Sequence, residues 1–168
     1  MTTLRATILA FIALTLTACG FTPMHAPAGL SDAAFNNVRI ELAAGIPVQD
    51  KEAAFWVQQA LKTRLGNGDS AKHILRVKPE ANRAGIGISG VDVATRYDLG
   101  LNVSYELIDM KSGKLLDSGS VKAISTIAAS TDPYALTAAE KATVRNLASD
   151  GADRVLVRLA GYYANAAQ

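Results

Sequence analysis

Few residues of this chain have side chains suited to catalysis or to metal binding. Its 168 residues include one cysteine, Cys19, and two histidines, His25 and His73. A structural zinc site needs several such ligands at short spacing and a disulfide needs a second cysteine, so we expect neither a metal site nor an internal disulfide. Serine and aspartate are plentiful, but no Gly-x-Ser-x-Gly segment marks a nucleophile. We therefore expect no catalytic residues and no enzyme activity.

One glycine-rich segment matches a cofactor motif in its letters. Residues Gly85–Gly90 read Gly-x-Gly-x-x-Gly, the pattern of a dinucleotide-binding turn. That turn requires a helix directly after it, because the amides of the helix N-terminus bind the pyrophosphate. The residues that follow here, Val91–Val93, have the pattern of a strand. We therefore expect a loop or strand tip, suited to contact with a partner or ligand, and no cofactor.

The position of Cys19 indicates a different chemistry for its thiol. Residues Met1–Arg5 are short and positive, and the apolar run Ala6–Leu16 has the length of a signal-peptide core. Such a run is too short to cross the ~30 Å of a bilayer's hydrocarbon. It ends in Leu-Thr-Ala-Cys, the pattern of the bacterial lipobox, which directs cleavage before the cysteine. We predict that residues 1–18 are removed and that Cys19 carries a covalent N-acyl diacylglycerol; at ~0.8 kcal/mol per buried methylene, several chains anchor a protein stably.

The residues after the cysteine indicate where the anchored protein goes and where it folds. Gly20 follows, in place of the aspartate that retains lipoproteins on the inner membrane, so we expect an outer-membrane location. Residues 19–37 contain two prolines and show no hydrophobic period, so we interpret them as a tether. We expect residues 38–168 to form a single domain.

Hydrophobic periodicity then alternates between strand and helix patterns. The predicted elements are a strand over Val38–Leu42, a helix over Lys51–Leu65 with Asp50 as its N-cap, a strand over His73–Lys78, a glycine-rich turn, a long strand within Val91–Met110, a hairpin turn at Lys111–Lys114, a return strand over Leu115–Ile127, and a helix of about 25 residues that opens at Asp132. Gly151 is predicted to mark a kink of this last helix or a close contact with the sheet.

This order predicts an α+β domain in which two helices pack on one face of a four-stranded mixed or antiparallel sheet. Each helix has a single apolar stripe, so the helices form one layer. The other sheet face stays polar unless a partner covers it, and it would carry Arg96, Asn102, Ser104 and Glu106.

The charge balance excludes one broad class of function. Lys and Arg total 17 against 15 Asp and Glu, without runs of like charge, so the chain lacks the basic face that nucleic-acid binding requires. Four basic residues fall in or near predicted loops and turns, where they either contact phosphates or are ordinary solvated side chains: Arg83, Arg96, Lys111 and Lys114.

Two short motifs resemble those of a known family. Residues Cys19–His25 read Cys-Gly-Phe-Thr-Pro-Met-His, similar to the Cys-Gly-Phe-x-Pro-Leu-Tyr start of the lipopolysaccharide-assembly lipoprotein family LptE, from which they depart at Met24 and His25. The stretch Tyr134–Glu140, which leads to Asp153–Ala160, is similar to the family's C-terminal part. Together with length and element order, the resemblance extends over nearly the whole chain.

The resemblance implies a non-enzymatic outer-membrane lipoprotein that sits as a plug in an LptD-type barrel, supports assembly of that barrel and helps lipopolysaccharide reach the outer leaflet. It gives no motif for the lipopolysaccharide contacts, so the four basic residues remain candidates. Two alternatives stay open: an accessory lipoprotein of another envelope lipid-transport (ABC-type) system and, from another class, a lipid-anchored periplasmic hydrolase.

Overall fold

The computed structural model describes residues 37–66, 68, 71–88 and 94–166. Cys19, the expected signal peptide and the expected tether up to residue 36 lie outside these residues, as do Gly90 and Val91–Val93. The elements in chain order are β1 (Val38–Leu42), a short 3₁₀ turn η1 (Val48–Asp50), α3 (Lys51–Leu65), β2 (His73–Ile88), β3 (Ala94–Asp109), β4 (Leu115–Ala128) and α4 (Pro133–Ala166).

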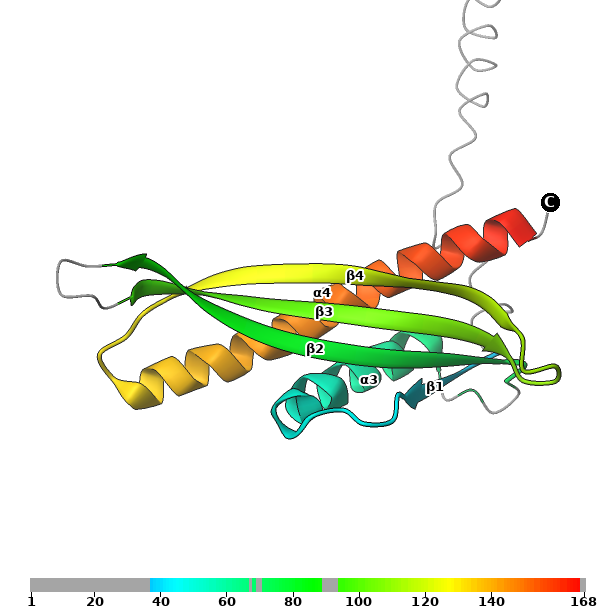
Figure 1. Cartoon of the computed structure of the whole chain (residues 1–168), viewed down its shortest axis with the longest axis horizontal. Coiled ribbons are helices and arrows are strands. Elements are labelled where there is room, and N and C mark those ends of the chain that lie inside the picture. The colour runs from blue at the N-terminus through cyan, green and yellow to red at the C-terminus, as the bar shows by residue number, and fades with distance from the viewer. Residues whose placement is uncertain (1–36, 67, 69–70, 89–93, 167–168) are drawn as a thin grey trace, which may run out of the picture.

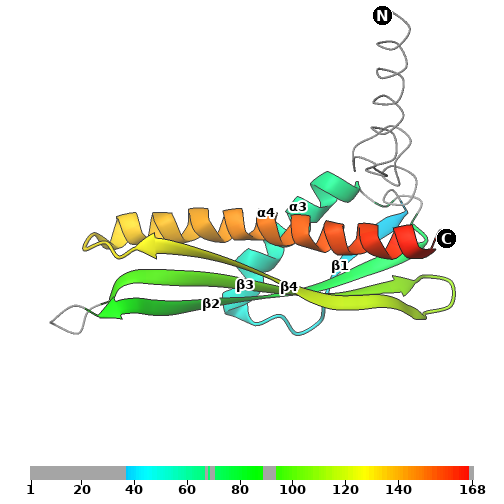
Figure 2. The same ribbon diagram turned by 90° about the horizontal axis from the view of Figure 1, so that it is seen from above.

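The strands form one four-stranded sheet in the order β1-β2-β3-β4 (Figure 1). β1 runs parallel to β2, and the two remaining pairs are antiparallel. Both helices lie on the same side of the sheet, where α3 contacts β1 and β2 while α4 contacts β3 and β4 (Figure 2). This confirms the predicted α+β architecture of two helices on one face of a mixed sheet.

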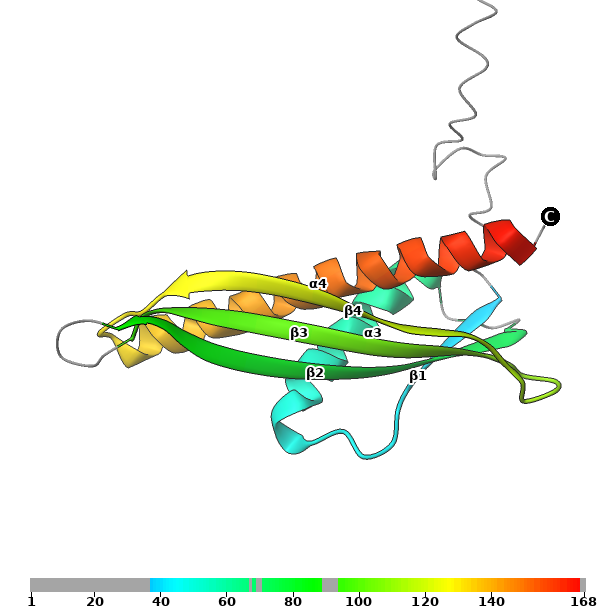
Figure 3. The same ribbon diagram turned by 45° about the horizontal axis from the view of Figure 1, so that its top comes forward.

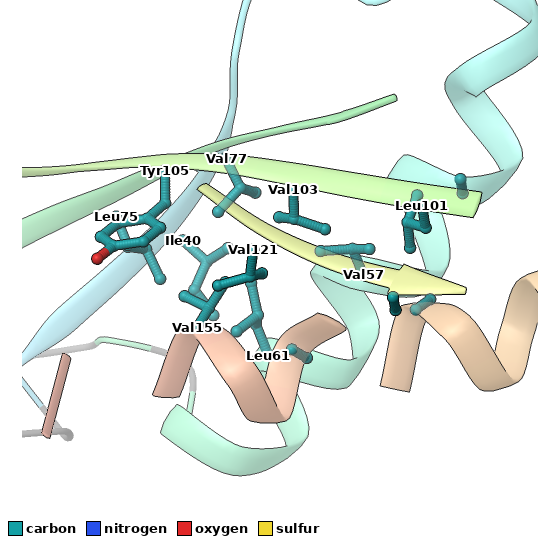
Figure 4. Close-up of a cluster of buried hydrophobic side chains, with 14 of the residues drawn as sticks. Ile40, Val57, Leu61, Leu75, Val77, Leu101, Val103, Tyr105, Val121 and Val155 are labelled. Atoms are coloured by element: carbon teal, nitrogen blue, oxygen red, sulfur yellow. The ribbon is translucent and has the colours of Figure 1, made fainter. Parts of the chain in front are cut away.

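Alternation along the strands builds the core between these two layers. Every second residue of β3 from Leu99 to Leu107 points toward the helices and is buried. These side chains meet Val57 and Leu61 of α3 and Val155 of α4 in one continuous cluster (Figure 4). Burial of each Val or Leu side chain stabilises the folded state by roughly 1.5–3 kcal/mol, so this single layer of contacts accounts for the attachment of both helices to the sheet.

Gly151 marks a close contact and no kink. A Cβ at this position would lie 3.2 Å from Cγ2 of Val103, so the absent side chain lets α4 approach β3. The helix continues unbroken for 34 residues, which makes the predicted length of about 25 too short. The last turns stay helical because Leu159 is buried in the core and Tyr163 packs against it.

The predicted end of the second strand at Lys78 is wrong, since β2 continues through Pro79 to Ile88. The carbonyl of Val77 accepts a hydrogen bond of 2.9 Å from Ala43, on the side of β2 away from β3. Backbone groups of alternate residues point to the same side, so the nitrogen of Pro79 also points away from β3, beyond the end of β1. Its missing N–H therefore costs no ladder bond, and the proline is tolerated inside a long strand.

The predicted glycine-rich turn is likewise a strand over Gly85–Ile88, which matches the alternative of a strand tip. Gly87 has a φ of 67°, and its carbonyl accepts a hydrogen bond of 3.1 Å from the Thr95 hydroxyl. A side chain here would be strained, because its Cβ would lie 2.6 Å from that hydroxyl oxygen. The described part of the segment is thus a glycine-adapted strand, and β3 begins at Ala94.

Asp50 occupies the N-cap position of α3 but makes no side-chain cap hydrogen bond, contrary to expectation. Its carboxylate is buried and accepts a hydrogen bond of 2.9 Å from the backbone N–H of Ala81. That amide points away from β3, in the part of β2 that β1 leaves unpaired. A backbone donor at an uncovered strand edge competes successfully for the carboxylate, so Asp50 caps a sheet edge in place of its own helix.

We expect Asp50→Ala to lower the free energy of unfolding by about 1 kcal/mol, because the Ala81 amide loses its acceptor and regains only water. Asp50→Asn keeps an oxygen acceptor and should lose less than half as much. Urea unfolding of the two variants measures the difference. Equal losses would show that the carboxylate does not act through this hydrogen bond.

Candidate functional site

The sheet face opposite the helices is not covered by any described element along its whole length (Figure 3). Arg96, Asn102, Ser104 and Glu106 lie on it, as predicted, together with polar residues of the neighbouring strands. These neighbours are Arg76, Lys78, Glu80 and Asn82 on β2, and Ser118, Ser120, Lys122 and Thr126 on β4. We call this surface the open face.

Most of the open face's acidic groups are paired locally. Lys78 Nζ lies 2.7 Å from Glu80 Oε1, and Arg76 Nη1 lies 3.5 Å from Glu106 Oε2. The Lys78–Glu80 hydrogen bond raises the pKa of Lys78. Exposed pairs of this kind stabilise a fold by at most about 1 kcal/mol, so they contribute mainly to hydration of the surface.

The hollow on this face is shallow, with a volume of about 410 Å³ and a lining that includes Arg76, Ser104 and Ser118. It offers polar groups without an enclosed apolar cavity, unlike most small-molecule sites. The open face is therefore a surface for a large hydrophilic contact.

Arg83 lies on the other side of the sheet, against α4. Its guanidinium carbon sits 3.8 Å from the centre of the Tyr97 ring, and its Nη1 is 2.8 Å from Oε1 of Glu140. The Glu140 oxygen is in contact with this charge without a hydrogen-bond geometry. Arg83 thus links β2 and β3 to α4, a contact that sequence reasoning did not anticipate because Tyr97 and Glu140 are far from Arg83 in the chain.

Lys111 and Lys114 lie in the β3–β4 turn, where both are exposed. Asp109 holds this turn, since its Oδ1 accepts hydrogen bonds of 2.6 Å from the Ser112 hydroxyl and 2.7 Å from the Ser112 amide. These hydrogen bonds lower the pKa of Asp109. Gly113 adopts a φ of 70°, as the predicted turn required. The two lysines are therefore presented on a well-defined turn.

The four candidate basic residues do not form one site. The strand register places Arg83 and Arg96 near the β2–β3 tip, whereas Lys111 and Lys114 follow the opposite end of β3. At about 3.3 Å per strand residue, the two ends are roughly 40–50 Å apart. Any shared ligand would have to span the length of the sheet.

His73 lies beside the C-terminal part of α4, at the same end as the β3–β4 turn. Its Nδ1 shares a hydrogen bond of 2.8 Å with the Tyr163 hydroxyl, and the two rings stack at 5.8 Å. Burial, and to a smaller extent the neighbouring Tyr162, raises the pKa of Tyr163 to about 12. Tyr162 and Tyr163 thus form a packing contact at the end of α4.

The raised pKa of Tyr163 predicts a loss of stability in strong alkali. The folded state holds the phenol proton more tightly than the unfolded chain, whose tyrosine pKa is about 10. The stabilisation of the folded state that results from this pKa difference is therefore complete below about pH 10 and is lost as the pH rises toward 12. Urea unfolding should show that, between about pH 10 and 12, the free energy of unfolding falls more for the wild type than for Tyr163→Phe, which has no phenol to titrate. A pH-independent difference would contradict the assignment.

Two absences bear on the classes of site available. Within residues 37–66, 68, 71–88 and 94–166, no group of three or more His, Cys, Asp or Glu side chains is arranged to hold a metal ion. In that same part of the chain, no helix has the length and apolar character needed to cross a bilayer.

Comparison with known proteins decides the family. The family model for LptE, described as lipopolysaccharide-assembly, matches residues 35–159, which extend from just before β1 to near the end of α4. The chain belongs to the LptE family. It is a lipopolysaccharide-assembly lipoprotein, and the sequence resemblance is confirmed. Comparison with curated proteins by sequence gives no match.

Solved structures of other lipoproteins share the fold of this LptE-family protein. A putative lipoprotein from Caulobacter crescentus CB15 matches with a TM-score of 0.64 at 22% identity, covering 80% of this chain and 95% of its own. The rare lipoprotein B from Shewanella oneidensis matches with a TM-score of 0.60 at 15% identity, covering 78% of this chain and 98% of its own. A minor lipoprotein from Acinetobacter baumannii matches with a TM-score of 0.55 at 14% identity, covering 76% of this chain and 94% of its own.

Proposed function

We propose that this LptE-family protein is anchored in the outer membrane through an acylated Cys19 and occupies the lumen of an LptD-type β-barrel. There it would support assembly of the barrel and assist the passage of lipopolysaccharide to the outer leaflet, without catalysis of its own. Residues 1–18 would serve as the cleaved signal peptide, residues 19–37 as the tether, and residues 38–168 as the plug.

The observation that carries this proposal is the open face. Three long strands present charged and hydroxyl side chains that the protein's own helices leave uncovered. A large barrel has a polar, water-filled interior, so a sheet face that is mostly hydrophilic, with exposed Ile86 and Ile124 among its polar side chains, can lie against it. The family membership provides the context of lipopolysaccharide assembly.

The basic residues at both ends of the sheet provide candidate contacts for the phosphates of lipid A. Arg96, Lys111 and Lys114 are exposed and have no ion pair among the described residues. Arg83 would have to exchange Glu140 for a phosphate, which makes it the weakest of the four in this role. Charge-assisted hydrogen bonds of this kind are the usual way in which Arg and Lys hold phosphate.

Co-purification tests the partner directly. The full-length protein carries a C-terminal tag, membranes are extracted in mild detergent, and proteins that elute in stoichiometric amount are identified. An outer-membrane barrel of the LptD type is the expected result. Recovery of an inner-membrane transporter or a periplasmic lipid carrier would overturn the barrel assignment in favour of another lipid-transport system.

A further inference from the structure

β4 is an edge strand of 14 residues, and none of the described strands lies on its outer side. The Ala129 amide donates a hydrogen bond of 3.0 Å to Thr95 of β3. In an antiparallel pair the bonded residues alternate, so the odd-numbered residues of this part of β4 bond to β3. The even-numbered residues direct their backbone N–H and C=O groups outward: Ser118, Ser120, Lys122, Ile124 and Thr126.

The two edges of the sheet differ in how far they are covered. Where β2 extends beyond β1, Pro79 has no N–H to offer and the Ala81 amide is bound by Asp50, and only the outward amides nearer the strand tip, of Arg83 and Gly85, have no hydrogen bond among the described residues. No comparable cover reaches β4, because within the described residues no hydrogen bond is made to its outward backbone groups. An unprotected strand of this length is a template for pairing with another strand.

A groove runs alongside this edge, between β4 and α4. Two hollows of about 820 and 430 Å³ share Ser120, Val157 and Arg158, so they are parts of one groove. Gly119 and Gly161 widen it by having no side chains. Val157 faces the groove with 59% of its surface exposed, which leaves an aliphatic contact beside the free edge. The groove therefore offers room for the side chains of one added strand.

Charge identifies the kind of chain that fits. Arg158 and Lys122 both line the groove, and neither has an ion pair among the described residues. Of the acidic groups nearby, Asp153 is paired with Arg64, whereas Asp117 accepts the Tyr105 hydroxyl and keeps its negative charge. The two unpaired cations outnumber the one unpaired acid. The uncompensated charge of the groove is therefore positive.

We propose that β4 and the β4–α4 groove bind an extended, acid-bearing segment of a different protein, which pairs with the β4 backbone as an added strand. An aliphatic side chain of that segment packs on Val157, and a carboxylate meets Arg158 and Lys122. A second copy that pairs through its own β4 does not fit, because that strand has Asp117 as its only acid and would bring a further Lys122 to the same edge.

This inference concerns the β4 edge, which borders the open face and shares Ser118, Ser120 and Lys122 with it, and it holds whether or not the partner is the proposed barrel. Strand addition obtains affinity from main-chain hydrogen bonds and specificity from alternate side chains. The main-chain hydrogen bonds and the side-chain contacts can therefore be tested separately. One substitution removes an outward amide of β4, and another reverses a charge of the groove.

The experiment places a photo-crosslinking amino acid at Val157 of the full-length protein in its own cells and sequences the crosslinked peptide. A second probe at Ala142, an exposed position of α4 away from the groove, is the matched control. The expected product at Val157 is a peptide with acidic residues that is absent at Ala142. Ser120→Pro, which removes an outward N–H without touching the β3 ladder, should lower its yield roughly tenfold. Ser120→Ala keeps that N–H and should leave the yield unchanged.

Arg158→Glu provides an independent test if the proline variant shows a reduced melting temperature. It should lower the yield by a similar factor while the melting curve is preserved. Equal yields for Ser120→Pro, Ser120→Ala and Arg158→Glu would overturn the proposal, as would a crosslink to lipopolysaccharide alone. If the peptide comes from a protein other than the barrel, strand addition is supported, and co-purification alone decides the barrel assignment. If the barrel co-purifies but Val157 gives no protein crosslink, only strand addition fails.

Discussion

Cys19→Ala should remain as an uncleaved precursor that incorporates no fatty acid. The thiol is the nucleophile that forms the thioether to diacylglycerol, and cleavage of residues 1–18 follows that modification in the lipobox pathway. Alanine has no sulfur, so both steps are lost together. Labelling with a radioactive or alkyne-bearing fatty acid, with immunoblotting of precursor and mature forms, measures the two effects. Normal maturation of this variant would refute the lipoprotein assignment of Cys19.

Gly20→Asp serves as the companion variant, because it leaves the thiol and the lipobox intact. We expect it to be acylated and cleaved like the wild type but to fractionate with the inner membrane. Cys19→Ala thus tests the anchor, and Gly20→Asp tests the destination. A Gly20→Asp protein that still fractionates with the outer membrane would show that sorting does not depend on this residue.

Leu159→Asp should unfold the domain. Leu159 has no exposed surface and belongs to the cluster that joins α4 to the sheet. The change removes its apolar contacts and buries a carboxylate without a partner, a combined cost of at least about 4 kcal/mol. That is comparable to the whole stability of many domains of this size. Circular dichroism melting should show the loss of the cooperative transition.

Val157→Asp is the matched control for this substitution. It introduces the same carboxylate two residues earlier in the same helix, but at a position whose side chain is 59% exposed. We expect a change in stability within about 0.5 kcal/mol, which is usual for surface positions. If both variants melted alike, the buried stripe of α4 would be wrongly assigned.

The strands and helices with strong local patterns were predictable. Their hydrophobic periods and turn residues correctly located β1, α3 and the β3–β4 hairpin. The strands bury every second side chain and α3 buries one stripe, each against a single apolar layer. β2 was not predictable in the same way. Pro79 normally ends a strand, and only the fact that β1 stops short makes its missing N–H harmless.

In the candidate site, too, some features were predictable from local sequence and others depended on tertiary contacts. The polar character of the open face followed from the alternation in β3, and the structure confirms it. The pairing of Arg83 with Glu140 did not follow, because the two residues lie on different elements that only the packing of α4 brings together. Nor could the sequence show that Arg83 and Arg96 lie on opposite faces of the sheet, because Arg83 was expected in or near a turn and not within β2.

The sequence alone therefore indicated the family, the predicted lipid anchor at Cys19 and the α+β architecture of one helix layer on one sheet, since each depends on a contiguous motif or a local period. Tertiary structure decided which backbone groups are covered. Asp50 reaches Ala81 across 31 positions of the chain, and β4 receives no equivalent contact within the described residues. Edge protection depends on which elements end beside one another in space, and no local pattern encodes that neighbourhood.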